Sequence, residues 1–350
     1  MILKINDKLI GKNNPCFIIA EAGVNHNQEL DLAIKLVDIA ADCRADAVKF
    51  QTFTGEDLVT ESGKMASYQK KNIGQEMTQR EMLKSVALPV KFYGPIMRRC
   101  KEKNILFMST PHGGKKAVDF LESLGVCAYK IGSGDLTNYI LLNKVAGTMK
   151  PIILSSGMAT LDEVKDAIKF IRSKGNNKIA VFHCTTNYPC PPKEANLAAM
   201  RTMMDRLNVP VGYSDHTEGN QVAIMAATMG MMLYECHFTT DKTLPGPDHI
   251  ASVEPDELKA RIDAIRKVPM VLGSKKKAPN KSEVESMRET VRKSIVATKN
   301  MTAGYIISED DIEAKRPGDG VSPVLFKSFL GKKLKHTIKI DQQIKKSDIE

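Results

Sequence analysis

The chain has 350 residues, of which 42% are hydrophobic and 26% charged, and its formal net charge at pH 7 is +10. These proportions exclude a fibrous or disordered chain, and the length suits a (β/α)₈ barrel of roughly 250 residues with a small appended domain. Trp is absent and aromatic residues make up only 5%, so the positive charge indicates a lysine-rich surface or an anionic small molecule, and no nucleic acid partner is expected.

The chain carries no apolar run of about 18 residues, and residues 1–7 lack the apolar stretch of a signal peptide. The seven cysteines are scattered without a CxxC pair, which fits reduced thiols better than disulfides or a zinc cluster. We therefore expect a cytoplasmic protein with no membrane partner.

Short runs rich in Ile, Val and Ala recur, and most precede a segment with helical spacing of its apolar residues. The expected strands are 17–20, 47–50, 105–108, 128–131, 152–154, 179–182, 209–212 and 232–234. The expected helices are 30–41, 91–103, 115–124, 161–174, 220–228 and 254–267. Repeated βα units of this kind predict an α/β fold, with a parallel sheet closed into a TIM barrel over residues 1–270.

A change of composition follows the last predicted helix. Lysine-rich polar sequence predicts a linker over residues 271–290, and a second small domain is expected over residues 291–350. Within that domain, short strands are expected at 294–297, 304–308 and 338–340, with a turn at 317–320.

Polar residues lie at the C-terminal end of most predicted barrel strands. They are Glu21, Lys49, Gln51, Ser109, Thr110, Lys130, Ser133, Ser155, His183, Ser214, His216, Glu235 and His237. Because these strand ends meet at one mouth in a (β/α)₈ barrel, the residues are expected to surround a single pocket.

Two lysines and nearby glycines indicate an anion site. Lys49 lies within a predicted buried strand, where an unpaired ammonium is costly, so we expect it to meet an anion or a carboxylate. Lys130 precedes Gly132-Ser133-Gly134, which alone reads as a flexible turn. Together with Ser155-Ser156-Gly157, these residues are typical of a phosphate cradle.

A carboxylate and two histidines complete the candidate chemistry. Glu21, in the segment 21–26, is either part of a capped turn or a base that also orients a sugar hydroxyl. His216 and His237 follow neighbouring strands, where each is either a hydrogen-bonded structural residue or one ligand of a shared ion. A sparse set of imidazole and oxygen ligands favours Mn²⁺ or a similar divalent cation over a closed zinc site.

The order of these motifs resembles the sialic acid (N-acetylneuraminate) synthase family, which includes the legionaminic and pseudaminic acid synthases. The matching segments are 21–26, 49–51, 107–111, 129–135, 155–158, 183–189, 212–216, 235–239 and 246–248. The tail resembles the family's antifreeze-like (SAF) domain at residues 293–294, 303–304, 315–318 and 345–348. The resemblance thus spans nearly the whole chain and implies a TIM barrel followed by a SAF domain.

The resemblance also implies an activity and roles for the residues. The family condenses phosphoenolpyruvate with the open-chain aldehyde of N-acetylmannosamine and water, giving N-acetylneuraminate and phosphate by C–O cleavage, assisted by Mn²⁺, with Mg²⁺ or Co²⁺ as alternatives. By resemblance, phosphoenolpyruvate is held by Lys49, Thr110, Lys130, Ser133, Ser155 and Ser214. The sugar then meets Gln51, Asp135, Thr186, Tyr188 and Asp248. His216 and His237 bind the metal, and Glu21 and Glu235 are the candidates for proton transfer.

A domain-swapped homodimer is also implied, in which Arg316 of one subunit reaches the N-acyl group of the sugar in the other. Two positions depart from the family pattern. Cys236 replaces a basic residue next to the metal-binding histidine, which puts metal affinity in question, and Gln28 replaces a frequent glycine.

Alternatives remain at this level. The same chemistry on 2,4-diacetamido-2,4,6-trideoxymannose gives legionaminic acid, and 6-phosphorylated N-acetylmannosamine is another acceptor. The segments 246–249 and 317–320 are more similar to the neuraminic and legionaminic branches than to the pseudaminic one. From other classes, a metal-dependent barrel aldolase or isomerase and a non-catalytic sugar-binding protein share the fold expectation.

Overall fold

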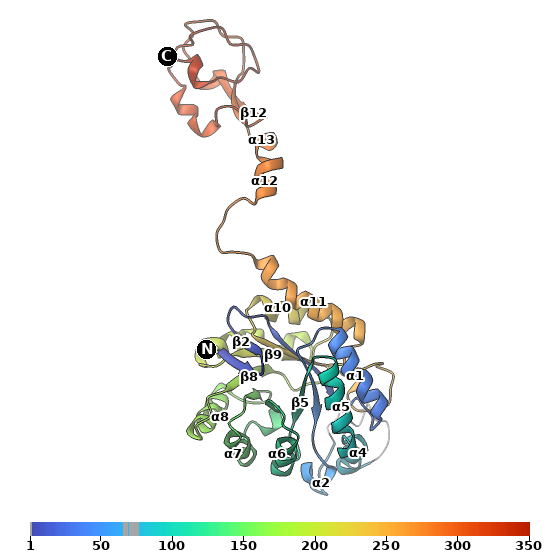
Figure 1. Cartoon of the computed structure of the whole chain (residues 1–350). Helices are drawn as coiled ribbons and strands as arrows, with labels where there is room; N and C mark the ends of the chain where they lie inside the picture. Colours follow the sequence, from blue (N-terminus) through green and yellow to red (C-terminus); the bar gives the residue numbers. More distant parts are fainter. Residues whose placement is uncertain (1, 66–68, 70–76) are drawn as a thin grey trace. The chain divides into compact units, whose positions relative to one another are not determined.

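The computed structural model describes residues 2–65, 69 and 77–350. The chain forms two compact units, Met1–Gly273 and Ser274–Glu350, and each is described by itself (Figure 1). Among the described residues, no helix has both the length and the apolar character needed to cross a membrane.

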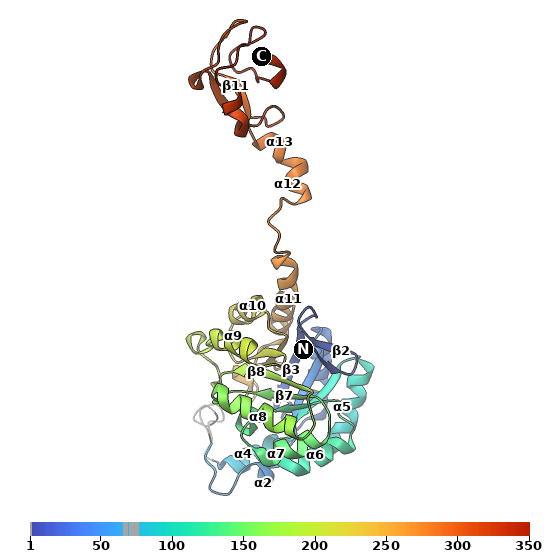
Figure 2. The ribbon, with the colours of Figure 1, turned by 90° about the vertical axis from the view of Figure 1, so that its left-hand side faces the viewer.

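The first unit is a TIM barrel built on an eight-stranded parallel sheet (Figures 1 and 2). Its strands are β3 (Phe17–Gly23), β4 (Ala47–Gln51), β5 (Leu106–Thr110), β6 (Tyr129–Ile131), β7 (Ile152–Ser155), β8 (Ile179–Cys184), β9 (Val211–Asp215) and β10 (Leu233–His237). They pair in the order β5-β4-β3-β10-β9-β8-β7-β6, and β5 and β6 at the two ends also contact each other. All eight predicted strands are therefore present.

Several strands extend beyond the predicted apolar runs. β3 continues to Gly23, β9 to Asp215 and β10 to His237, so the polar residues expected after the strands lie within them. The reason is that inward-facing positions near a barrel mouth carry polar side chains, which end the apolar pattern before the strand itself ends.

Helices surround the sheet. They are α1 (Leu30–Asp42), α5 (Val90–Glu102), α6 (Gly114–Ser123), α7 (Tyr139–Gly147), α8 (Leu161–Ser173), α9 (Leu197–Arg206), α10 (Gln221–Thr228) and α11 (Pro255–Leu272). α8 illustrates how the sequence specifies them, because Thr160 and Glu163 form a capping box at its start and its buried residues recur every three or four positions.

Two of these helices, α7 and α9, were not predicted. In α7, Leu141, Leu142, Val145 and Ala146 are buried while the apolar Ile140 is exposed. Apolar residues therefore surround the helix, and the contrast between faces that reveals an amphipathic helix is missing.

Two apolar layers stabilise the barrel. One lies between the strands and the helices, and the other fills the barrel interior at the N-terminal ends of the strands. The antiparallel pair β1 (Ile2–Ile5) and β2 (Lys8–Gly11), which was also not predicted, contributes Leu3, Ile5 and Ile10 to the interior layer. This hairpin closes the end of the barrel opposite the mouth.

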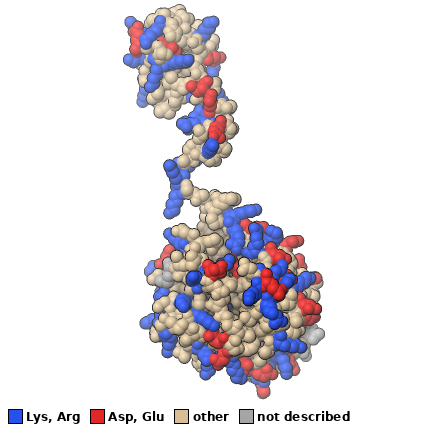
Figure 3. Space-filling view, in the orientation of Figure 1, with Lys and Arg blue, Asp and Glu red and all other residues tan. Residues whose placement is uncertain are grey.

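In its described part, the connection between β4 and α5 carries the helices α2 (Gly55–Leu58) and α4 (Gln79–Val86). On the face drawn in Figure 3, Lys and Arg side chains of the barrel unit are interspersed with Asp and Glu. The positive charge on this face thus does not form one continuous patch.

The second unit contains α12 (Lys281–Ser286), α13 (Arg288–Val291) and the antiparallel pair β11 (Ser294–Ala297) and β12 (Ile312–Lys315). The strand expected at 294–297 is confirmed. Those expected at 304–308 and 338–340 are wrong, because each segment contributes only an isolated bridge, Ile306 to Lys333 and Met301 to Ile338. Gly304 has a φ of +81°, which turns the chain before a ladder can extend.

Candidate active site

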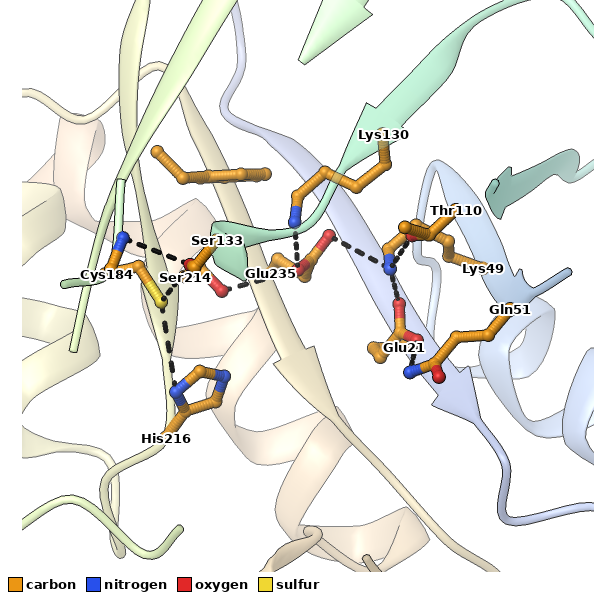
Figure 4. A network of polar contacts seen from close by, with 12 residues as sticks. Glu21, Lys49, Gln51, Thr110, Lys130, Ser133, Cys184, Ser214, His216 and Glu235 are labelled. Atoms are coloured by element: carbon orange, nitrogen blue, oxygen red, sulfur yellow. Dashed lines mark hydrogen bonds and ion pairs between the residues drawn. The ribbon is translucent and has the colours of Figure 1, made fainter. Parts of the chain in front are cut away.

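A cluster of ion pairs lies at the mouth of the barrel (Figure 4). Lys49 forms an ion pair with Glu21, and its Nζ lies 3.8 Å from Glu235 Oε2 and 3.0 Å from Thr110 Oγ1. Lys130 Nζ lies 3.1 Å from Glu235 Oε1. These lysine and glutamate side chains are at most 5% exposed, so each charge depends on its neighbours rather than on water.

The strand register explains why these residues meet. His237 is paired with Glu21 between β10 and β3, Glu21 with Lys49 between β3 and β4, and Glu235 with Ser214 between β10 and β9. Adjacent parallel strands place paired side chains side by side on the same face. Residues that are far apart in sequence therefore form one row across the barrel interior.

The two carboxyl groups have different proton affinities. Burial raises the pKa of Glu21 above its ordinary value, although the Lys49 ammonium opposes this shift. Burial also acts on Glu235, but Lys130 and Lys49 together lower its pKa to about 2. Two titratable groups whose surroundings separate their pKa values are suited to different roles, so Glu235 is a permanent anion while Glu21 can carry a proton.

A cradle of hydroxyl and amide groups adjoins Lys130. The Gly157 amide donates to Ser133 Oγ at 3.0 Å, and a Cβ on Gly157 would lie 2.0 Å from Thr186 Oγ1 and 2.6 Å from Ser133 Oγ. Any larger residue at position 157 would clash with these two side chains, so the position requires glycine. Thr186 Oγ1 is buried and has no hydrogen-bond partner in the part of the chain that the structure describes, which leaves it available to a ligand. Ser155, at the end of β7, is buried nearby in the same row of strand ends, and Ser214 donates to Glu235 at 3.3 Å.

The two predicted metal ligands lie together. The ring centroids of His216 and His237 are 5.6 Å apart, and the ring of Tyr188 packs on His216 with the centroids 4.0 Å apart and the planes tilted by 37°. His216 Nδ1 lies 2.8 Å from the Thr185 carbonyl oxygen and donates to it, which leaves its Nε2 free for another role.

His237 is a neutral imidazole in this environment. Burial, with His216 and Lys49 nearby, holds its pKa well below the ordinary value, and its Nδ1 is buried without a hydrogen-bond partner among the described residues. No group of three or more His, Cys, Asp or Glu side chains with metal-binding geometry occurs in the described part of the chain. The pair fits a divalent cation whose other ligands come from water and substrate.

Four of the five residues expected to bind the sugar line a pocket of about 480 Å³ beside these histidines, and Thr186, which lies beside Gly157, does not. Its polar lining includes Gln51, Asp135, Tyr188, His237 and Asp248. Gln51 Nε2 lies 3.4 Å from Glu21 Oε1, and burial raises the pKa of Asp248 to about 6, with Glu21 adding to the shift. The pocket thus adjoins the carboxyl group that can carry a proton.

His112 is a pocket residue that the sequence reading missed. Its Nδ1 lies 3.2 Å from Asp135, and a Cβ on Gly132 would lie 2.6 Å from its ring. Although burial acts in the opposite sense, the imidazole lowers the pKa of Asp135. The available signal was its position directly after Thr110-Pro111, at a strand end.

The expectation that His183 faces the mouth is wrong. Its Nε2 lies 2.8 Å from the Ala195 carbonyl oxygen, and its ring lies 5.9 Å from that of Tyr213, in the layer between strands and helices. Because side chains alternate along β8, Cys184 takes the inward position, with its Sγ 4.0 Å from His216 Nδ1. The imidazole and Lys130 lower the pKa of this thiol to about 7, against the effect of burial.

A buried arginine supports the two histidine-bearing strands from behind. Arg261 of α11 is 2% exposed, and its Nη1 donates to Asp215 of β9 and to Tyr234 of β10, at 3.4 and 3.0 Å. Cys236 packs in the same layer beside Arg261, away from the barrel interior, where burial raises its pKa to about 11. The departure at Cys236 therefore leaves the inner surface of the site unchanged, because Glu235 and His237 occupy the inward positions.

Arg316 belongs to the unit Ser274–Glu350, where its side chain is exposed directly after β12. It is not among the residues that the barrel strands gather. The other predicted residues, which all belong to the barrel unit, lie at the ends of its strands or in the loops that follow them. The expectation that Ser109 faces the pocket is wrong, because it alternates with the inward-facing Thr110 and its Oγ donates to the Phe50 carbonyl oxygen at 3.2 Å.

Comparisons with known proteins agree with this arrangement. A model of the NeuB family matches residues 36–277, and a model of the SAF domain matches residues 292–350. The chain is 42% identical to an N,N'-diacetyllegionaminic acid synthase of Campylobacter jejuni, over 94% of this chain and 98% of that protein. It is 43% identical to an N,N'-diacetyllegionaminic acid synthase of Legionella pneumophila, over 95% of this chain and 94% of that protein.

Comparison with solved structures also finds a similar synthase. The N-acetylneuraminic acid (sialic acid) synthetase of Leptospira borgpetersenii, in complex with citrate, matches with a TM-score of 0.73 at 33% identity. The match covers 82% of this chain and 95% of that chain.

Proposed function

The chain belongs to the sialic acid synthase (NeuB) family, and from this membership we propose that it condenses phosphoenolpyruvate with an N-acetylated amino sugar and water. The products are a nine-carbon 2-keto sugar acid and inorganic phosphate. The observation that carries the proposal is the pair of buried lysines, Lys49 and Lys130, held ready by Glu21 and Glu235 beside the Ser133 and Gly157 cradle. Phosphoenolpyruvate presents a phosphate and a carboxylate, which two such cations complement.

For the acceptor, we favour 2,4-diacetamido-2,4,6-trideoxymannose, which gives N,N'-diacetyllegionaminic acid. The support is the similarity to two proteins named for that product, at 42% and 43% identity over nearly the whole chain. N-Acetylmannosamine is the second candidate, and the match to a sialic acid synthetase structure at 33% identity favours it.

His216 and His237 would hold a divalent cation, Mn²⁺ in this proposal. When bound there, such a cation polarises the aldehyde oxygen of the sugar. The neutral state of His237 and its unpartnered Nδ1 support the assignment. Tyr188, packed on His216, would limit the access of bulk water to this corner of the site.

Glu21 handles the proton in this proposal. Glu21 is ion-paired with Lys49 in this structure, and its raised pKa lets it take up a proton when the phosphoenolpyruvate anion replaces it as the partner of Lys49. It then donates this proton to the aldehyde oxygen while C3 of phosphoenolpyruvate bonds to C1 of the sugar. Water then adds to C2, and one of its protons returns to Glu21. The other proton passes from the new C2 hydroxyl to the departing phosphate as the bond between C2 and the phosphate oxygen breaks, which leaves the 2-keto group. Glu235 stays ionised and positions Lys49 and Lys130.

The test is phosphate release from phosphoenolpyruvate with Mn²⁺ and one of four additions: no sugar, N-acetylmannosamine, its 6-phosphate, or the 2,4-diacetamido sugar. We expect release only with a sugar, fastest with the diacetamido compound, and a product mass equal to sugar plus pyruvate. Lys49→Met should abolish release. Retained sugar cleavage without phosphate release would favour a barrel aldolase, and sugar binding without turnover would favour a non-catalytic protein.

We also propose a homodimer with swapped C-terminal domains, in which Arg316 of one subunit contacts the N-acyl group of the sugar in the other. The exposed position of Arg316 in its own unit supports this. Arg316→Ala and His237→Ala would each be inactive alone. Mixed after unfolding and refolding, they should regain activity, because one site then combines an intact barrel with an intact tail. No regain would refute the exchange.

A further inference from the structure

One side of the sugar pocket is apolar, and α4 contributes three of its residues. Met82, Leu83 and Val86 line the pocket together with Val24 from the segment after β3. The spacing of the three α4 residues places them on one face of the helix. We call these four residues the α4 wall. They belong to a separate apolar cluster that also contains Phe53 and Met65.

The α4 wall is joined directly to the reacting end of the site. A Cβ on Gly23 would lie 3.4 Å from both Glu21 and His237, and Val24 is the next residue. The rest of the lining combines polar residues, among them Gln51, Asp248 and His237, with the apolar Leu58, Val59 and Pro247. The pocket is therefore two-sided, with hydrogen-bonding groups near the histidines and a methyl-rich surface on α4.

The charged side chains among the described lining residues are also of one sign. Among the described residues that line it, none is Lys or Arg, and Asp135 and Asp248 are the carboxylates. Among the described residues of one subunit, a sugar phosphate in this space would face carboxylates with no cation in the lining, which is unfavourable. A neutral acceptor that ends in apolar groups meets no such cost.

Gln28 holds the α4 wall in place. Its Nε2 donates to the carbonyl oxygens of Lys84 and Ala87, at 2.7 and 2.9 Å, at the C-terminal end of α4. These carbonyls have no partner within the helix, so the amide of Gln28 caps them. Because Gln28 follows β3 by only five residues, the segment that carries Glu21 and Val24 also fixes the position of the helix. A glycine at this position would provide no such donors.

On the basis of the proposed function, we infer that the α4 wall selects the acceptor by receiving its methyl-bearing end, a 6-deoxy carbon rather than a hydroxymethyl or phosphorylated carbon. With the aldehyde directed at His237, the far end of the sugar lies against Met82 and Leu83. Gln28 is a positioning residue for this surface.

The experiment compares kcat/KM for the 2,4-diacetamido-trideoxy sugar with kcat/KM for N-acetylmannosamine, at saturating phosphoenolpyruvate. Met82→Ala should lower the ratio of the two values about tenfold, the range expected for losing apolar contacts with a methyl group. Met65→Ala is the matched control, because Met65 is buried in the same cluster but does not line the pocket. Its ratio should equal that of the unmodified protein.

Gln28→Met keeps the length of the side chain but removes the two donors. It should raise KM for the diacetamido sugar several-fold while KM for phosphoenolpyruvate stays unchanged. Equal losses for both sugars in Met82→Ala, or a ratio shifted as much by Met65→Ala, would overturn the inference while the proposed function stands. Absence of phosphate release from the unmodified protein with every sugar would instead overturn the proposed function, and this inference with it.

Discussion

Replacing Arg261 with Met should destabilise the barrel by removing the cation behind the two histidine-bearing strands. Arg261 and Asp215 are 2% and 0% exposed, and the guanidinium also bonds Tyr234 and the loop carbonyl oxygen of Thr217. Leaving one charge of a buried pair without its partner costs about 3–5 kcal/mol. For a domain of this size, each kcal/mol lowers Tm by about 2–4 °C, so a fall of about 6–20 °C is expected in differential scanning calorimetry.

Two companion variants sharpen the test. Lys259→Met removes a pair with Asp263 in which the side chains are 52% and 25% exposed, and it should cost less than about 1 kcal/mol. The double variant Arg261→Met, Asp215→Asn removes the orphaned charge, so it should be more stable than Arg261→Met alone. A single variant that costs less than the Lys259 control, or a double variant no more stable than the single one, would refute the role given to this pair.

Three further predictions concern the mouth. His237→Ala should abolish calorimetric Mn²⁺ binding while leaving the circular dichroism spectrum unchanged, and undiminished Mn²⁺ affinity would contradict the two-histidine site. Asp248, whose pKa is raised to about 6 by burial, favours the folded state below its unfolded pKa of about 3.9 and loses this contribution as pH rises through 6. Asp248→Asn should therefore gain stability relative to the unmodified protein between pH 4 and 7 in urea unfolding, and a constant difference would contradict the shift. Gly157→Ala places a Cβ 2.0 Å from Thr186 Oγ1 and should raise KM for phosphoenolpyruvate about tenfold with little effect on the sugar, whereas equal effects on both would argue against the cradle.

Much of the site could be predicted because the C-terminal ends of barrel strands meet at one mouth, which brings residues from different strands close together. Lys49 was expected to meet an anion or a carboxylate, and it pairs with Glu21 on the neighbouring strand. His216 and His237 were expected to lie together, and their rings are 5.6 Å apart. Both predictions needed only the position of each residue at a strand end.

Other features could not be predicted, because they depend on which way a side chain points or on contacts between distant segments. Side chains alternate along β8, so His183 points away from the mouth and Cys184 points toward it, and the predicted strand, which ends two residues before β8 does, could not reveal this. The sequence does not distinguish Arg261 from an exposed helix arginine, because its buried contacts form only when α11 packs against β9 and β10. The bond from Gln28 to Lys84 likewise joins segments whose proximity only the folded chain establishes.

The hairpin of β1 and β2 has a consequence for the order of events during turnover. With Ile5 and Ile10 sealing one end of the barrel, both substrates and both products must pass through the same opening. The lysines proposed to bind phosphoenolpyruvate are only 3% exposed, whereas Gln51 and Tyr188 are more exposed. In the proposed reaction, a sugar that arrived first would block the way to the lysines, so we expect phosphoenolpyruvate to bind before the sugar and the sugar acid to leave before the next cycle begins.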